Sequence, residues 1–200
     1  MSKKIAIMST GESVVLDSVY KFLKQDGVEI TCISDYLNSG ILKAAKLMGL
    51  NEKYLPYEQN TEYFSSENFD LILIDGYEKE LSEETLTLGK FVDIHQSLLP
   101  SFKGHDALRR AFVSGVKVSG VTISYISSDK SESAIIAQYP VLINNTDHFD
   151  DFQKNINGLE KVLVPRVVKS ILDDTVFDYN DLFNVSCGSS CGGNCGNCSH

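Results

Sequence analysis

Residues 91–104 read Phe-Val-Asp-Ile-His-Gln-Ser-Leu-Leu-Pro-Ser-Phe-Lys-Gly. The first five residues predict a β-strand that ends at His95. Side chains two residues apart point to the same face of a strand, so Asp93 and His95 share one surface. The turn Leu98-Leu99-Pro100 leaves the strand directly afterwards. In open parallel sheets ligands bind at this carboxyl edge, so the segment predicts a ligand site at the end of a sheet strand.

Apolar runs bounded by turn residues alternate with helical patterns along the chain, which is typical of an α/β fold with a mostly parallel sheet. Before the quoted segment we expect strands over 5–8, 28–34, 53–57 and 69–75, and helices over 13–24, 41–48 and 81–90. After it we expect a helix over 105–114, strands over 119–127 and 134–143 that pair as an antiparallel extension, and a helix over 150–173 interrupted at Pro165. The sequence therefore predicts a Rossmann-like domain over residues 1–185, followed by a Cys/Gly-rich tail over 186–200.

Length and charge restrict the function classes. The chain has 200 residues, 42% of them hydrophobic, which is enough for one substantial core. A net charge of -9 argues against nucleic acid as a partner, because such proteins need a clustered basic face. We interpret Lys103, Arg109, Arg110 and Lys117 as a solvated helix face. No apolar run reaches the roughly 18 residues that span a bilayer, and the N-terminal apolar stretch is too short for a signal peptide. We expect a cytoplasmic protein with a small-molecule substrate and no membrane partner; the oligomeric state stays open.

Three segments carry a family resemblance. His-Gln-Ser-Leu-Leu-Pro at 95–100, Gly120-Val-Thr-Ile and Ile135-Ile-Ala-Gln follow one another at spacings that resemble those of the folate-dependent formyltransferases, in particular those that formylate glycinamide ribonucleotide. The resemblance implies a three-layer formyltransferase fold. It also implies one-carbon transfer from 10-formyltetrahydrofolate to a small amine.

The resemblance assigns roles to individual residues. His95 matches the catalytic histidine, and acyl transfer needs such a group to relay the proton of the amine. Tyr77, Lys79 and Leu81 fall in the segment that lines the folate pocket of the family. Glu160 stands where the family uses a glutamate to hold the sugar hydroxyls of its acceptor.

Two catalytic positions differ from the family. Asp93 replaces an asparagine whose amide donates to the developing oxyanion, and Ser131 replaces an aspartate that orients the histidine or a water. Asp129 and Glu132 lie on the same loop as Ser131, and Asp93 can itself supply the missing carboxylate beside His95. This hypothesis predicts that Asp93→Ala abolishes turnover and that Glu132→Ala does not. The alternative is a catalytically degenerate member that binds a ligand without reacting.

The turn after the first strand also differs. The family has a glycine-rich turn there, whose backbone amides and helix N-terminus cradle the phosphate of the acceptor. The corresponding residues, our candidates for substrate binding, are Ser9, Thr10, Gly11, Glu12 and Ser13. Glu12 repels a phosphate, so an amine without phosphate fits this turn better.

The C-terminal tail suggests a metal centre. Cys187, Cys191, Cys195 and Cys198 are separated by Gly, Ser and Asn alone. Four thiolates at this spacing on a glycine-rich chain can surround a zinc ion or an iron-sulfur cluster. A tail with no ordered centre is the alternative. The third function class is therefore a metal or iron-sulfur protein that acts through its tail.

Overall fold

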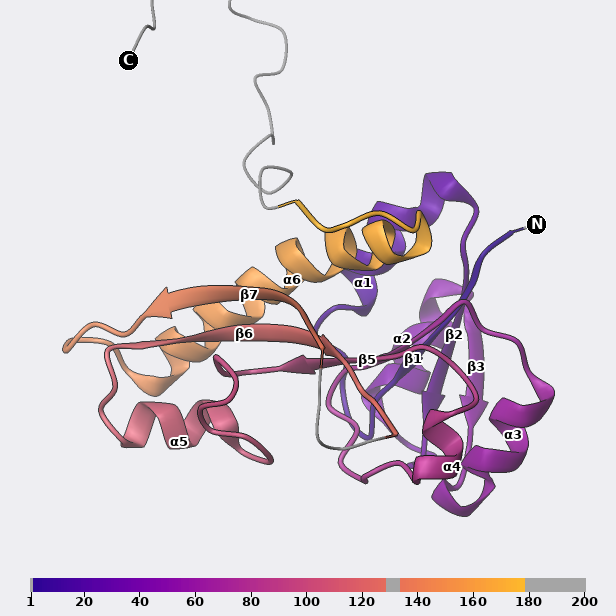
Figure 1. The fold of residues 1–200 in the computed structure, drawn as a ribbon, viewed down its shortest axis with the longest axis horizontal. Helices are drawn as coiled ribbons and strands as arrows, with labels where there is room; N and C mark the ends of the chain where they lie inside the picture. Colours follow the sequence, from indigo (N-terminus) through magenta and orange to yellow (C-terminus); the bar gives the residue numbers. More distant parts are fainter. Residues whose placement is uncertain (1, 129–133, 179–200) are drawn as a thin grey trace, which may run out of the picture.

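The computed structural model of the chain describes residues 2–128 and 134–178. Within this range seven strands form one sheet in the order β3-β2-β1-β4-β5-β6-β7. Neighbours from β3 to β5 run parallel, whereas the two pairs β5–β6 and β6–β7 are antiparallel (Figure 1). The predicted mostly parallel sheet with an antiparallel extension is therefore confirmed. The strands are β1 (Lys4–Met8), β2 (Glu29–Ser34), β3 (Asn51–Tyr54), β4 (Leu71–Ile74), β5 (Phe91–His95), β6 (Val118–Tyr125) and β7 (Ile135–Leu142).

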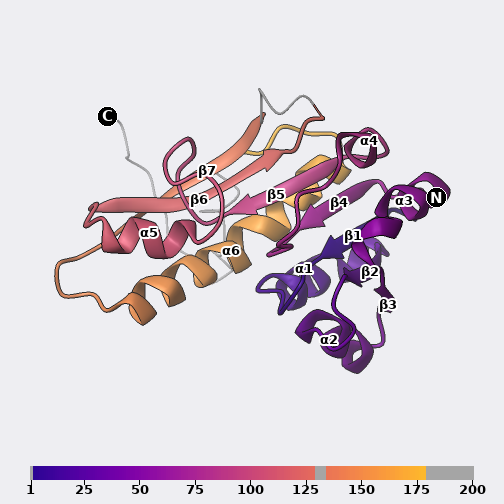
Figure 2. The ribbon, with the colours of Figure 1, turned by 90° about the horizontal axis from the view of Figure 1, so that it is seen from below.

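Helices cover both faces of the sheet, which confirms the three layers. Figure 2 shows one group of helices along one side of the sheet and another group on the other side. The first group is α1 (Leu16–Leu23), α2 (Gly40–Met48), α5 (Ala107–Val113) and α6 (Phe149–Leu172). The second group is α3 (Asn60–Ser66) and α4 (Glu83–Leu86), and single 3-10 turns span Lys24–Asp26 and Tyr57–Gln59. In the described part of the chain, no helix is both long and apolar enough to cross a membrane.

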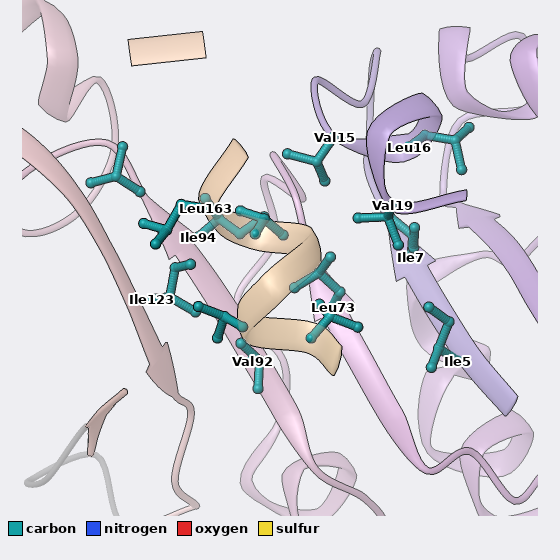
Figure 3. Packing of buried hydrophobic residues seen from close by; sticks show 14 of the residues in the cluster. Ile5, Ile7, Val15, Leu16, Val19, Leu73, Val92, Ile94, Ile123 and Leu163 are labelled. Atoms are coloured by element: carbon teal, nitrogen blue, oxygen red, sulfur yellow. The ribbon is translucent and has the colours of Figure 1, made fainter. Parts of the chain in front are cut away.

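The central strands are buried on both faces. Ile5 and Ile7 of β1 pack with α1 and α6, whereas the intervening Ala6 and Met8 pack under α3 and α4. Figure 3 shows the first of these two cores, with Leu163 of α6 over the strands. Because successive side chains of a strand alternate in direction, a sheet covered on both faces needs continuous apolar runs. This explains why such runs mark the central strands in the sequence.

Some expected elements differ in extent. The helix expected over 81–90 is limited to α4, because Ser82 begins it by accepting a hydrogen bond from the Thr85 amide at 3.1 Å and a turn follows at once. A Cβ at Gly89 would lie 2.8 Å from Ile72 Cδ1, so a larger residue there would have to displace the end of the Ile72 side chain. The short strand expected over 53–57 is shifted to Asn51–Tyr54, and α3 was not predicted.

The interruption expected at Pro165 was wrong. Helix α6 continues from Phe149 to Leu172 with Pro165 inside it. Pro165 is buried together with its neighbours Leu163, Val164 and Val167. Packing of this apolar stripe against the sheet outweighs the single hydrogen bond that the proline removes.

The two downstream motifs hold the turn that follows β5. Thr122 Oγ1 donates to the carbonyl of Ser97 at 2.6 Å and accepts from the amide of Leu99 at 3.0 Å. Gln138 Nε2 donates to the carbonyl of Leu99 at 2.8 Å and to Thr122 Oγ1 at 3.0 Å. A Cβ at Gly120 would overlap the carbonyl of Tyr139 in the neighbouring strand. The two downstream motifs therefore contribute the side chains that hold the turn after His95 in place.

Candidate active site

His95 lies at the carboxyl end of β5 with Asp93 on the same face. Its side chain is 15% exposed, and its Nδ1 lies 4.0 Å from Asp93 Oδ2. Its Nε2 lies 3.1 Å from the carbonyl oxygen of Phe102. A carbonyl oxygen accepts hydrogen bonds, so Nε2 carries a proton, and Nδ1 is the ring nitrogen that faces Asp93. Burial raises the pKa of Asp93, and Asp75 adds to this effect, whereas His95 and the Ile94 amide lower the pKa.

The loop after β5 folds back over His95. Phe102 and Asp106 both have a φ of 55°, in the left-handed region. Arg110, which we expected on a solvated helix face, donates to the carbonyls of Phe102 and Lys103, each at 2.8 Å, and to that of His105 at 3.1 Å. This residue therefore helps to hold the loop that fixes the tautomer of His95. No sequence pattern indicates this role.

A cavity of about 400 Å³ lies on one side of His95. Asp93 and His95 line it, and so do the three residues predicted to bind the folate, Tyr77, Lys79 and Leu81. Lys79 Nζ lies 3.4 Å from Asp35 Oδ2. Apolar side chains that belong to the core beneath α3 and α4 form much of the wall: Ile74, Leu86 and Ile126.

A second cavity of about 290 Å³ is also lined by His95, and it shares Gly76, Ile94 and Gly104 with the first cavity. Two of the predicted substrate-binding residues, Glu12 and Glu160, line it together with Asp75 and Asp106. His95 lines both cavities, so a group bound in one can meet a group bound in the other at the imidazole. This arrangement suits a transfer between two ligands.

The other four predicted residues of the first turn lie beside this cavity rather than in its lining. Each of them makes a hydrogen bond inside the protein. The three hydroxyl groups donate: Ser9 Oγ to the Glu12 carbonyl at 3.1 Å, Thr10 Oγ1 to Asp35 Oδ1 at 2.9 Å, and Ser13 Oγ to Asp75 Oδ2 at 2.6 Å. The Gly11 carbonyl accepts from the Ile41 amide at 2.9 Å.

Asp75 is a functional candidate that the sequence analysis missed. It follows β4 directly, is 7% exposed, and accepts from Ser13 Oγ at 2.6 Å and from the Val15 amide at 3.3 Å. These donors belong to the N-terminus of α1, so an internal carboxylate occupies an anion-binding position. Burial raises the pKa of Asp75 although the hydrogen bonds from Ser13, Val15 and Val14 lower it. The sequence does contain one signal for Asp75, which is an acidic residue placed directly after the fully apolar strand β4.

Glu160 reaches the second cavity from α6. It is 1% exposed, its Oε2 accepts from Gln96 Nε2 at 3.2 Å, and its Oε1 has no hydrogen-bond partner among the residues that the structure describes. Burial raises the pKa of Glu160 to about 8; Asp75 adds to the rise, whereas Gln96 and Lys161 act against it.

Replacing Glu160 with glutamine is expected to make the protein less sensitive to alkaline pH. The folded state keeps the proton of Glu160 up to about pH 8, whereas the ordinary value is 4.5. Unfolding between these values releases a proton, so the stability of the wild type falls as the pH rises through this window. The unfolding free energies taken from melting curves should be similar for the two proteins at about pH 5 and should favour Glu160→Gln by roughly 2–4 kcal/mol at about pH 8.

Asp75 and Asp93 titrate in both proteins, so the comparison isolates Glu160. The same substitution at the exposed Glu62 of α3 is the matched control and should follow the wild type. An identical pH dependence for Glu160→Gln and the wild type would contradict the expectation.

Several predicted site residues fall outside the described ranges. These are Ser131 and Glu132 in the loop before β7, and the tail cysteines Cys187, Cys191, Cys195 and Cys198. Within 2–128 and 134–178, no three His, Cys, Asp or Glu side chains are grouped in a way that would hold a metal ion. The metal centre of the tail therefore stays a prediction.

The fold and the site define an α/β protein in which two ligand-sized cavities meet at one histidine. Residues 3–168 match the formyl transferase family model, so the chain belongs to the formyl transferase family. It is 28% identical over 185 residues to the phosphoribosylglycinamide formyltransferase of Bacillus subtilis, which covers 85% of this chain and 95% of that protein.

Two further comparisons agree with this membership. The chain is 28% identical over 191 residues to formyltetrahydrofolate deformylase 2, mitochondrial, of Arabidopsis thaliana, covering 88% of this chain and 58% of that protein. The crystal structure of phosphoribosylglycinamide formyltransferase from Bacillus halodurans has a TM-score of 0.79 to this chain at 24% identity, covering 88% of this chain and all 100% of that one. This last comparison supports the fold.

Proposed function

We propose that this protein transfers the formyl group of 10-formyltetrahydrofolate to a small amine. The observation that carries the proposal is the position of His95, which lies between two cavities with a carboxylate 4.0 Å from its Nδ1. The names of the relatives point to the same chemistry, because they denote formyl transfer or the removal of formyl from formyltetrahydrofolate.

The larger cavity is the proposed donor side. Its volume of about 400 Å³ lies within the range of small-molecule sites. Ile74, Leu86 and Ile126 offer apolar surface to a flat ring system, and Tyr77 adds an aromatic ring. The residues present therefore fit a folate, which enters the reaction as a substrate.

The proposed reaction needs one base and one acid. The amine nitrogen attacks the formyl carbon, and the bond from that carbon to the folate nitrogen breaks. The amine loses a proton and the departing folate nitrogen gains one. His95 Nδ1 is the group placed to relay this proton, because the Phe102 carbonyl holds the other ring nitrogen in its protonated form. Asp93 stabilises the imidazolium that forms in between.

Water is the competing acceptor, since one relative is named as a formyltetrahydrofolate deformylase. Incubation with 10-formyltetrahydrofolate, with and without an amine, separates the possibilities. We expect tetrahydrofolate to be released faster with amine present, together with a formylated amine detected by mass spectrometry. Equal release without amine would show hydrolysis instead. Binding of the folate without release over hours would support the catalytically degenerate class.

The metal centre is a separate proposal for the tail. It rests on the four cysteines between residues 187 and 198 and is independent of formyl transfer. Metal analysis and visible absorbance after anaerobic purification, compared with protein lacking residues 186–200, test for zinc or an iron-sulfur cluster.

A further inference from the structure

The smaller cavity beside His95 is lined by carboxyl groups. Glu12, Asp75, Asp106 and Glu160 contribute to its wall, and His95 is the one basic side chain among the described residues that line it. Burial favours the protonated forms of Asp75 and Glu160, whereas Glu12 and Asp106 are exposed acidic side chains, which repel anions and attract cations.

Glu160 supplies an observation that does not depend on the charge count. Its side chain is 1% exposed, and its Oε1 has no partner although the residue lines the cavity. Buried carboxyl oxygens are almost always hydrogen-bonded, and one that lacks a protein partner beside a cavity can receive a hydrogen bond from a bound ligand. The group that satisfies a carboxyl oxygen is a hydrogen-bond donor, and an ammonium is the strongest of these.

The position at which the family binds a phosphate is already filled. Ser13 Oγ and the Val15 amide, at the start of α1, donate to Asp75 at 2.6 and 3.3 Å. Glu12 lines the cavity next to this turn, and its backbone packs against Gly40, where an added Cβ would overlap the Glu12 side chain. A phosphorylated acceptor would therefore have to compete with Asp75 for Ser13 Oγ and the Val15 amide, with a second carboxyl group close by.

The cavity wall also contains apolar side chains. Val14, Ala107, Leu108 and Phe149 belong to the same lining. Such surface suits methylene groups, which gain free energy by leaving water. The cavity volume of about 290 Å³ accommodates a short aliphatic chain.

We propose that the acceptor is an aliphatic amine whose far end carries a second positive charge, such as a short diamine, with its distal ammonium bound by Glu160. This inference rests on the proposed function and names the acceptor class of the same site. The distal ammonium takes the place of the proton that Glu160 carries in the absence of an amine; this proton passes to solvent, and the ammonium donates to Oε1 of the resulting carboxylate. The other, uncharged amine nitrogen reaches His95 and receives the formyl group. The product is the monoformylated amine together with tetrahydrofolate.

Three acceptors of equal length test the charge of the distal group: 1,4-diaminobutane, 4-amino-1-butanol and 4-aminobutanoate. Calorimetric titration without any folate should give the strongest binding for the diamine, about 10- to 100-fold tighter than for the alcohol, and the weakest for the acid. Glu160→Gln should remove the preference for the diamine, whereas Glu62→Gln, on the exposed side of α3, should keep it. Melting curves of both variants verify that they are folded.

Binding measured without a formyl donor keeps the two proposals apart. If the diamine binds in a Glu160-dependent way and no formyl transfer follows, the proposed function fails and this inference stands. If formyl transfer occurs and the three amines bind alike, or glycinamide ribonucleotide binds more tightly than the diamine, this inference is overturned and the function stands.

Discussion

Replacing His95 with alanine is expected to lower kcat/KM for formyl transfer by about 10³-fold, because general acid–base catalysis contributes roughly 10² to 10⁴. The reason lies in the geometry at the end of β5. One ring nitrogen is fixed by the Phe102 carbonyl, and the other is left to exchange protons beside Asp93. Steady-state formation of tetrahydrofolate with the amine acceptor measures the effect.

Added imidazole provides the control for this variant. The ring of His95 lines both cavities, so its removal leaves space in which free imidazole can bind. Partial recovery of the rate, with a melting temperature close to that of the wild type, identifies the loss as chemical rather than structural. A variant that keeps more than about one tenth of the activity would rule out His95 as the proton-relaying group.

Replacing Asp93 with asparagine is the second prediction, and we expect kcat/KM to fall by about 10²- to 10³-fold. Asparagine has the same shape but carries no charge, so it cannot stabilise the protonated imidazole. The opposite expectation follows if Asp93 acts as a hydrogen-bond donor in its protonated form, because an amide donates permanently and the activity would then rise.

The pH profile distinguishes the two roles further. Burial raises the pKa of Asp93, so the wild type should lose activity on the acid side at a higher pH than an ordinary carboxyl group would produce. Since a carboxylate is required in the proposed role, this acid limb should disappear in Asp93→Asn. If Asp93→Asn loses activity at acid pH in the same way as the wild type, the loss is caused by another titrating group.

The sheet and the central motif were accessible from sequence because their signals are local. Buried parallel strands such as β4 read as continuous apolar runs, and β5 was predicted with its observed bounds. The residues that hold the turn after β5, Thr122 and Gln138, fall within the two downstream motifs. Long-range spacing therefore carried three-dimensional information for this part of the site.

The acceptor side was not accessible in the same way. Asp75 lies 62 residues away from Ser13 in sequence, and its role depends on the strand order that places β4 next to β1. Glu160 was assigned by resemblance, but its unpartnered oxygen follows from how α6 packs across the sheet. Pro165 shows the same limit, since tertiary packing overrode a local helix-breaking signal.

The Asp75 carboxyl group occupies the hydrogen-bond donors at the start of α1, so it competes with any free anion for this site. A tethered group is present at a local concentration far above that of any free solute, so an incoming phosphate ester has to displace it before it can bind. The turnover of this protein should therefore be indifferent to whether nucleotides and inorganic phosphate are scarce or abundant around it.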